Sequence, residues 1–189
     1  MPENNYTINS KQDIANFIKE NKKTNCYEKK INEVNYKLKY ISNEEMALRN
    51  VNDIELLNQT RFDSILKDYD SLVFFNLEIS IDDFYEDILK YKLDGDVEFN
   101  YSQLVEYYSF KMQKDIQLVQ NEKDTIPCAL YHYERNFGVS PKTNIMIGFK
   151  LKNTKNLTFV YENKHLRTSI IKIAIKEEDI LKHPHIKIG

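Results

Sequence analysis

Four side chains that could do chemistry fall within one short stretch of this sequence, DTIPCALYHYERNFG at residues 124–138: a cysteine, a histidine, a glutamate and an arginine. On a helix, the four-residue spacing of Cys128 and His132 would place thiol and imidazole about 6 Å apart, close enough for a nucleophilic thiolate–imidazolium pair. On a strand, the same residues span about 13 Å, on one face but out of hydrogen-bond reach. Pro127 and the neighbouring tyrosines favour a strand. We therefore predict no catalytic dyad here.

A strand in this stretch would divide its side chains into two rows. We predict an inward row of Ile126, Cys128 and Leu130 and an opposite row of Ala129, Tyr131, Tyr133 and Arg135. His132 and Glu134 continue the inward row, where we expect a histidine held by structural hydrogen bonds. A hydrolase that uses His132 and Glu134 with a distant acid remains an alternative hypothesis.

Two acidic clusters have the composition of a cation site without the pattern that one requires. In DDFYED, residues 82–87, the carboxylates stand at the expected N-terminus of a helix, where the helix dipole favours anions. In LDGDVEFN, residues 93–100, Phe99 and Val105 replace the glycine and the bidentate glutamate of a calcium loop. HPH at residues 183–185 supplies only two imidazoles. We predict no metal site.

Nucleotide and nucleic-acid chemistry are also disfavoured. The sequence contains neither GxxxxGK[ST] nor GxGxxG, and it has only four glycines from which a phosphate-binding loop could be made. A GxSxG nucleophile motif is likewise missing from the sequence. The formal net charge is −2, and the lysines are interspersed with acids rather than gathered on one stretch. We predict no cofactor and no nucleic-acid partner.

Length and hydropathy indicate a globular protein. The 189 residues suffice for one domain with its own core, and 41% hydrophobic with 30% charged residues is a globular balance. No apolar run reaches the roughly eighteen residues that a membrane span needs. The polar start MPENNYTIN lacks the apolar region of a secretory signal, so we expect residues 1–9 to form a flexible tether.

The first part of the chain mixes helical and strand patterns. Ser10 with Asp13 resembles a capping box at the start of a helix. Strict alternation predicts a strand over 34–41, and β-branched and aromatic residues predict another over 71–81. We expect further helices over 42–50, from Asp53 to Tyr69, after a cap at Ser80 with Ile81, Phe84, Tyr85 and Ile88 on one face, and over 100–113.

The second part reads as strands separated by polar turns. We predict strands over 116–120, 125–135, 144–153, 156–163 and 169–176. The fold class is therefore α+β, with helices and two strands in the first part and an antiparallel β meander or sandwich in the C-terminal part. We expect residues 10–189 to form a single domain, with a soft division near residue 112.

Thirteen tyrosines without a tryptophan suggest a recognition face, because the apolar ring and polar hydroxyl of tyrosine suit partly hydrated interfaces. Most of them are expected at the edges of the core. The candidate binding residues are Tyr101, Tyr107, Tyr131, Tyr133 and Arg135.

The stretch MQKDIQLVQNEKDTIPCALYHYERNFGVSPKTNIMIGF, with LTFVYEN after it, resembles uncharacterised predicted lipoproteins of the Bacteroidota over residues 112–189. The resemblance implies an exported protein tethered by a lipid on a cysteine before residue 1, and it brings no site residues. Cys26 and Cys128 are the two cysteines of the chain, and either two free thiols or one disulfide is open. Export would favour the disulfide.

Three functional hypotheses follow. The first is a non-enzymatic, extracytoplasmic interaction protein of the cell envelope whose partner is another protein or an envelope component. The second is an immunity protein that neutralises a toxic effector, and the third is the hydrolase with His132 and Glu134. A cytoplasmic location stays open as the alternative to the envelope.

Overall fold

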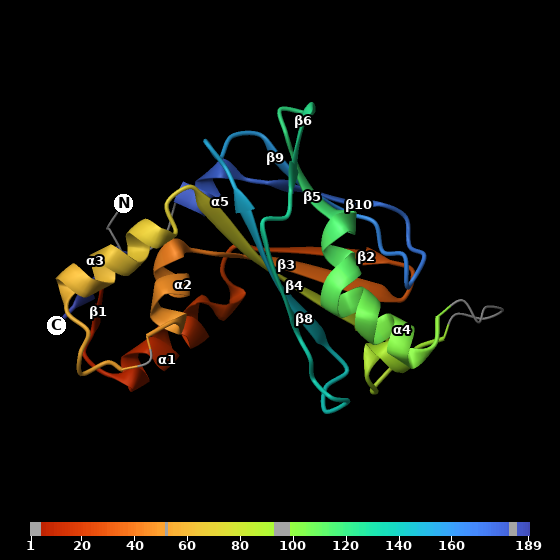
Figure 1. Cartoon of the computed structure of the whole chain (residues 1–189), viewed down its shortest axis with the longest axis horizontal. Coiled ribbons are helices and arrows are strands. Elements are labelled where there is room, and N and C mark those ends of the chain that lie inside the picture. The colour runs from red at the N-terminus through yellow and green to blue at the C-terminus, as the bar shows by residue number, and fades with distance from the viewer. Residues whose placement is uncertain (1–4, 52, 93–98, 182–184) are drawn as a thin grey trace.

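The computed structural model describes residues 5–51, 53–92, 99–181 and 185–189. Its described part contains two antiparallel sheets, a pair of parallel strands and several short helices (Figure 1), which confirms the predicted α+β class.

The larger sheet has five antiparallel strands and combines both halves of the chain. Its order is β2 (Cys26–Ile31), β3 (Val34–Ile41), β4 (Leu72–Ile81), β8 (Thr143–Lys150) and β7 (Leu130–Glu134). The pairing of β4 with β8 crosses the soft division that the sequence predicted near residue 112. The two parts of the sequence therefore share one sheet.

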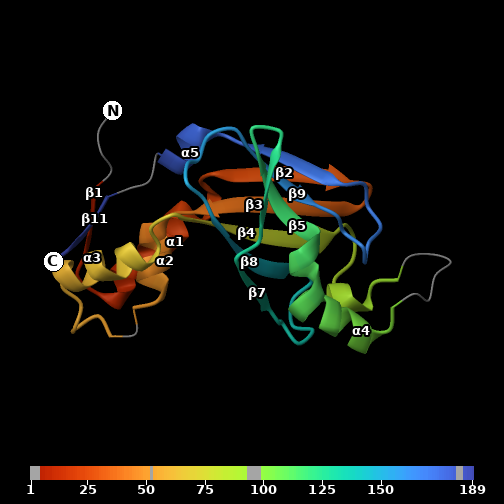
Figure 2. The same cartoon turned by 45° about the horizontal axis from the view of Figure 1, so that its top comes forward.

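The smaller sheet packs face to face on the larger one (Figure 2). Its strand order is β10 (Ile171–Ile175), β9 (Leu157–Tyr161), β5 (Ile116–Gln120) and β6 (Asp124–Pro127). Ring contacts join the layers, as between Phe75 of β4 and Phe159 of β9, whose centroids are 6.4 Å apart. The alternating residues of β3, β4, β8 and β9 meet in one buried core, as expected for a sandwich.

A helical lobe lies to one side of this sandwich and contains both ends of the described chain (Figure 1). Its elements are β1 (Asn5–Ile8), α1 (Lys11–Glu20), η1 (Asn21–Lys23), α2 (Asn43–Arg49), α3 (Gln59–Asp68) and β11 (His185–Ile188). Ser10, Ser42 and Asn58 cap the three helices by accepting a backbone N–H three residues on, which confirms the predicted starts of α1 and α2.

The prediction of a flexible tether is wrong for residues 5–8. They form β1, which pairs in parallel with β11 near the C-terminal end of the described residues. Ile8 and Ile186 are buried with Phe17 in the core of the lobe, and this burial is what holds the two ends together.

The helix predicted after Ser80 is wrong. Strand β4 continues through Ile81, because Ile79 and Ile81 keep the alternation of the buried face. Asp83 then turns the chain with a φ of 52°, and the helical structure that follows is the short 3₁₀ turn η2 (Ile88–Lys90).

The predicted rows of residues 126–135 hold for Ile126 and Cys128, which pack against the core, but they are reversed from Leu130 on. The chain leaves the smaller sheet after β6 and enters the larger one at β7, so Cys128 and Ala129 form a crossing and not the middle of one strand. After this crossing Tyr133 faces the core, whereas Leu130 is 47% exposed. Side chains alternate between the two faces within each strand, but the alternation of β6 does not continue into β7.

The helical lobe covers one end of the outer face of the larger sheet. Lys39 of β3 is buried there, and its ammonium donates to both carboxylate oxygens of Glu45 in α2, at 3.0 and 3.1 Å. Arg49 donates to the same carboxylate at 2.7 Å. On the neighbouring strand, Phe74 meets the ring of Tyr69 at 5.5 Å.

Gly148 is required by close packing on this outer face. A Cβ at this position would lie 3.0 Å from the Cβ of Leu130 and 3.1 Å from the Cε1 atom of Phe74. We expect Gly148→Ala to lower the free energy of unfolding by about 1–3 kcal/mol, as overpacking does in other cores. Urea denaturation measures this change, and an unchanged or raised midpoint would contradict the packing.

Candidate recognition surface

A helical segment with an unusual turn lies beside β7. It consists of α4 (Tyr101–Glu106), the π-helical turn η3 (Tyr107–Lys111) and the 3₁₀ turn η4 (Met112–Asp115). Asn100 and Gln103 form a capping box at its start, with bonds of 2.8 and 3.0 Å. The π-helical turn places two consecutive tyrosines, Tyr107 and Tyr108, in the core. Such turns occur frequently at functional sites.

The two buried tyrosines anchor the segment. The hydroxyl of Tyr107 donates to Asp115 at 3.0 Å, and that of Tyr108 lies 3.1 Å from Nδ1 of His165. Strand β7 packs against them, since the rings of Tyr108 and Tyr133 are 5.6 Å apart. The Tyr131 hydroxyl donates to the backbone carbonyl of Tyr108. The η3 turn and β7 therefore form one packed unit.

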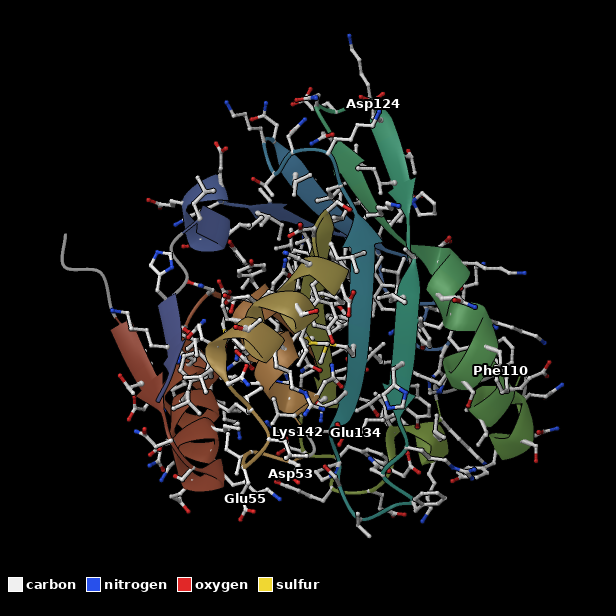
Figure 3. The ribbon with its side chains drawn as sticks, turned by 60° about the vertical axis from the view of Figure 1, so that its left-hand side comes forward. Asp53, Glu55, Phe110, Asp124, Glu134 and Lys142 are labelled. Atoms are coloured by element: carbon white, nitrogen blue, oxygen red, sulfur yellow. The ribbon has the colours of Figure 1, made fainter. Side chains whose placement is uncertain are left out.

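Exposed apolar side chains concentrate on this unit. Among the described residues, ten large hydrophobic side chains are exposed. Three of them are Phe99, just before α4, and two residues of the α4–η3 segment, and three more come from β7 and the loop after it. We call these six, together with Arg135, the β7 surface: Phe99, Tyr101, Phe110, Leu130, Arg135, Phe137 and Val139. Leu130 lies on the outer side of β7, with His132 and Glu134, whereas Tyr131 and Tyr133 face the α4–η3 segment. Figure 3 shows Phe110 on the α4–η3 segment, and Glu134 and Lys142 at the adjoining ends of β7 and β8.

Fixed contacts hold the polar members of this surface. The Tyr101 hydroxyl donates to Oδ2 of Asp87 at 3.3 Å, and Oδ1 of this buried carboxylate accepts the Leu89 N–H at 3.1 Å. The Arg135 guanidinium stacks over the Phe137 ring, 4.7 Å from its centroid. Burial, with the nearby Asp87 carboxylate, raises the pKa of Tyr133 to about 12. The Tyr133 hydroxyl is therefore neutral at physiological pH.

The structure brings the five predicted binding residues close together, but two of them are exposed and three are buried or half-buried. Tyr101 is 40% exposed and Arg135 is also exposed, so both can reach a partner. Tyr107 and Tyr133 are buried and Tyr131 is half-buried, so these three belong to the packing beneath the surface and are not available to a partner. Phe110, Phe137 and Val139 were missed, although the apolar residues in NFGVS within a polar turn were a sign of exposure.

His132 and Glu134 lie on the outer, solvent-facing side of β7. The expectation of a structurally bonded His132 is wrong, because the ring is exposed and no hydrogen bond joins it to another described residue. No described nucleophile or carboxylate is therefore hydrogen-bonded to this imidazole, and the geometry gives the hydrolase hypothesis no support.

The buried histidine of this chain is His165, which the sequence did not single out. It follows β9, is 7% exposed and contacts Tyr108. Burial lowers its pKa to about 4, against an opposing effect of the Tyr91 backbone. The imidazole is therefore neutral in the folded protein above that pH.

This buried imidazole predicts a pH dependence of stability. The unfolded chain binds the His165 proton below pH 6.5, whereas the folded protein resists it down to about pH 4. Stability is thus complete above 6.5 and falls between 6.5 and 4, by about 3 kcal/mol from this group. We expect His165→Gln to remove this contribution, so that its unfolding free energy falls less than that of the wild type between pH 7 and 4. Parallel profiles from urea denaturation would contradict this assignment.

The two cysteines cannot form the disulfide that export would favour. Both are free thiols, and they lie toward opposite edges of the larger sheet, Cys26 in β2 and Cys128 just before β7. Four strand spacings of about 4.8 Å put these edges on the order of 19 Å apart, whereas a bridge needs Cα atoms within about 7 Å. Burial raises the pKa of Cys128 to about 11, so this thiol is a poor nucleophile.

The acidic stretches serve local structure where they are described. Asp82 pairs with Lys30 and accepts a hydrogen bond from Asn35 at 2.6 Å, and Asp87 caps η2. Within the ranges that the structure covers, no group of three or more potential metal ligands is present. The acids of LDGDVEFN at positions 94–98, and the first histidine of HPH, lie outside the described residues.

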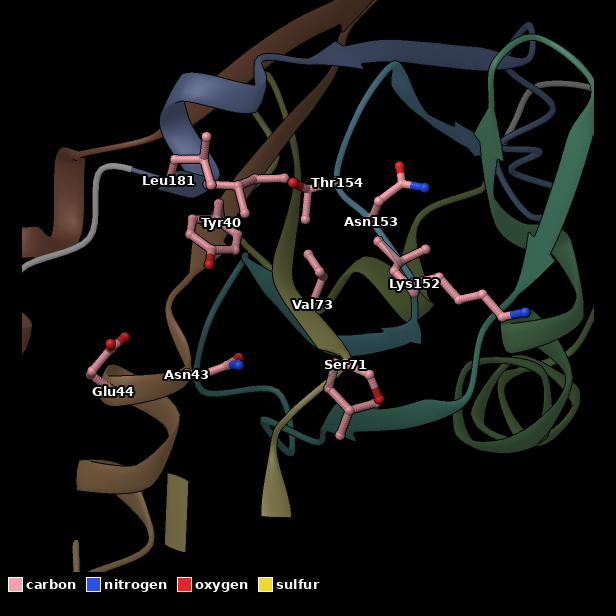
Figure 4. Close-up of a pocket in the computed structure, with 12 residues that line it drawn as sticks. Tyr40, Asn43, Glu44, Ser71, Val73, Lys152, Asn153, Thr154 and Leu181 are labelled. Carbon is pink, nitrogen blue, oxygen red and sulfur yellow. The ribbon is translucent and has the colours of Figure 1, made fainter. Parts of the chain in front are cut away.

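Two cavities are notable. One, of about 420 Å³, opens on the outer face of the larger sheet among lysines and glutamates. Its charges are mostly paired, as in Lys37 with Glu28 at 3.2 Å and Lys142 with Glu78 at 2.8 Å. The other, of about 250 Å³, lies between the helical lobe and the sandwich (Figure 4).

The chain is similar to a small number of solved structures. No protein-family model and no curated protein matches the chain. Among solved structures it is similar to a protein of unknown function from Burkholderia pseudomallei, at 12% identity and a TM-score of 0.38, covering 90% of this chain and 86% of the other. It is also similar to a DUF4426 family protein from Pseudomonas aeruginosa, at 6% identity and a TM-score of 0.40, covering 79% and 92%. None of the described helices is long and apolar enough to cross a membrane.

Proposed function

We propose that this protein is a non-enzymatic binding protein that recognises another protein through the β7 surface. The observation that carries the proposal is the concentration of six exposed apolar side chains on two neighbouring segments. Single exposed apolar residues need no explanation, but a group of them on one unit is typical of an interaction site.

The chemistry of the surface suits protein recognition. Aromatic residues and arginine dominate the binding energy of many protein interfaces, and Phe110, Phe137, Tyr101 and Arg135 are of these types. Arg135 and Phe137 are already stacked, and Tyr101 is already hydrogen-bonded. Because these groups are ordered before binding, less conformational entropy is lost when a partner docks.

The partner proposed is another protein or a cell-envelope component. The extracytoplasmic, lipoprotein-like location is part of the same proposal and is supported by the sequence resemblance over residues 112–189. The immunity hypothesis differs from it in the identity of the partner, which would then be a toxic effector. Protection of a cell that expresses a captured effector would distinguish the two.

Differential capture tests the proposal. The bait proteins are the wild type, the double variant Phe110→Ser/Phe137→Ser, and the matched control Leu56→Ser/Ile170→Ser, whose two residues are exposed by 60% and 52% outside the β7 surface. We expect at least one protein from the source cells to bind the wild type and the control but not the Phe110→Ser/Phe137→Ser variant. Equal capture by all three baits, or by none, would contradict the proposal.

A further inference from the structure

The larger sheet ends at β2 with an open strand edge. In the described part of the chain, β2 pairs only with β3, and β7 forms the other end of the same sheet. The Tyr40 N–H donates to the Asn25 carbonyl at 3.0 Å, which makes these two residues a hydrogen-bonded pair. Such pairs recur at every second residue of an antiparallel ladder, so Glu28 and Lys30 direct their N–H and C=O groups away from β3. These two residues can therefore pair with one more strand.

The inward side chains of β2 fix this strand to the smaller sheet. Strands β2 and β10 lie on the same side of the sandwich (Figure 1). The Lys29 ammonium donates to the Lys172 carbonyl at 3.3 Å, and the Lys176 N–H donates to the Tyr27 hydroxyl at 3.1 Å. This hydroxyl in turn donates to Asp179 of α5 (Glu177–Leu181) at 2.6 Å. Because β2 is ordered by these contacts, little conformational entropy is lost when another strand pairs with it.

A row of alternating charges crosses the outer face of the larger sheet and ends at this edge. Lys142 pairs with Glu78 at 2.8 Å. Lys37, which is opposite Glu78 in the register, pairs with Glu28 at 3.2 Å. Glu28 is the last member of the row, and its side chain is 71% exposed. A strand that pairs with β2 is therefore favoured if it places a cation opposite Glu28.

Lys30 of a second copy of the chain would be this cation. When two β2 strands pair antiparallel about a two-fold axis at Lys29, Glu28 of each copy stands opposite Lys30 of the other. Lys30 is 56% exposed and pairs within its own chain with Asp82, which is 40% exposed. Each Glu28–Lys30 pair would exchange backbone hydrogen bonds as well as opposite charges. The two Lys29 side chains meet at the axis, but their ammonium groups are directed to the Lys172 carbonyls.

We propose that this chain forms a two-fold symmetric homodimer through antiparallel pairing of its β2 strands, with Glu28 opposite Lys30. The pairing joins the two larger sheets into one, and an isologous contact of this kind closes after two copies. A contact made by one short strand buries a small area, so the dimer is reversible. The homodimer does not depend on the proposed function, because β2 and β7 are at opposite edges of the sheet.

Sedimentation velocity over a range of protein concentrations tests this dimer. We expect the wild type to pass reversibly from monomer to dimer as its concentration rises. Glu28→Lys and Lys30→Glu should each weaken the dimer by roughly tenfold or more, because each places like charges opposite one another in both pairs. The matched control Asp124→Lys reverses a charge on β6, an edge strand of the smaller sheet, and should dimerise as the wild type does. A monomeric wild type, or an equal loss in the control, would overturn the proposal.

A mixture of the two single variants tests the register. In a mixed dimer of Glu28→Lys with Lys30→Glu, the introduced lysine faces the introduced glutamate, and the unchanged Lys30 faces the unchanged Glu28. The mixture should therefore dimerise with an affinity near that of the wild type, although neither variant does so alone. No association in the mixture, with both variants folded by circular dichroism, would overturn the pairing. If either variant is unfolded, Glu28→Gln and Lys30→Gln take their place; each should weaken the dimer severalfold, and unchanged association would overturn the proposal.

Discussion

Glu45→Gln should lower the free energy of unfolding by about 3–5 kcal/mol, because it leaves a buried lysine without its counter-ion. Glu45 is 3% exposed and pairs with Lys39, which is 8% exposed. Arg49 shares the same carboxylate from one turn further along α2. The three charges connect the helical lobe to the outer face of the larger sheet, so their disruption acts on the docking of the whole lobe.

Urea denaturation at neutral pH measures this effect, with Glu86→Gln as the matched control. Glu86 also pairs with a lysine, Lys90 at 3.1 Å, but both side chains are more than half exposed, so we expect a loss below about 1 kcal/mol. The double replacement Lys39→Met/Glu45→Leu should recover most of the stability, since no buried charge is then left unpaired between them. A Glu45→Gln loss as small as that of Glu86→Gln would mean that the buried pair does not hold the lobe.

The second large effect concerns affinity. With a captured partner, Phe110→Ser and Phe137→Ser should each weaken binding by about 2 kcal/mol, which is roughly a thirtyfold rise in Kd. Both side chains are exposed, at 68% and 74%, so each change should alter stability by no more than about 0.5 kcal/mol. Isothermal titration calorimetry gives the first quantity and urea denaturation the second. A loss of stability as large as the loss of affinity would identify the two rings as structural.

Much of the fold followed from local patterns. Strand β3 alternates Val34, Tyr36, Leu38 and Tyr40 toward the core, and Ser42 then caps α2 through its hydroxyl, as their sequence predicted. These patterns depend on residues within a few positions of each other, so they can be recognised in the sequence without the tertiary structure. Alternation alone predicts an exposed side chain at Lys39, on the outer face of the strand. This prediction is wrong, because the helical lobe covers Lys39.

The features that the sequence did not predict depend on distant contacts. The pairing of β1 with β11 joins the two ends of the chain, and no local pattern in residues 5–8 marks it. The crossing at Cys128 moves the chain from one sheet to the other, and from Leu130 on it reverses the rows that continuous alternation predicted. Pairing with a distant strand determines which residues of a strand face each other. The sequence of a short apolar segment does not show which strand will be its partner.

The sequence predicted several residues of the candidate site, but not which of them are exposed and which are buried. Tyr101 and Arg135 are exposed at the place that the structure indicates, whereas Tyr107 and Tyr133 proved to be supporting core residues. The π-helical turn explains the difference around Phe110: it directs Tyr107 and Tyr108 inward together and leaves Phe110 outward, an arrangement that a regular helical period does not predict.

Hydrogen–deuterium exchange of the complex with the captured partner locates the binding surface on this protein. We predict that binding protects the backbone amides of residues 107–111 and 130–139, while those of α3 at residues 59–68 keep the exchange rates of the free protein. Protection confined to the helical lobe, or to the outer face of the larger sheet over β2 and β3, would contradict recognition through the β7 surface.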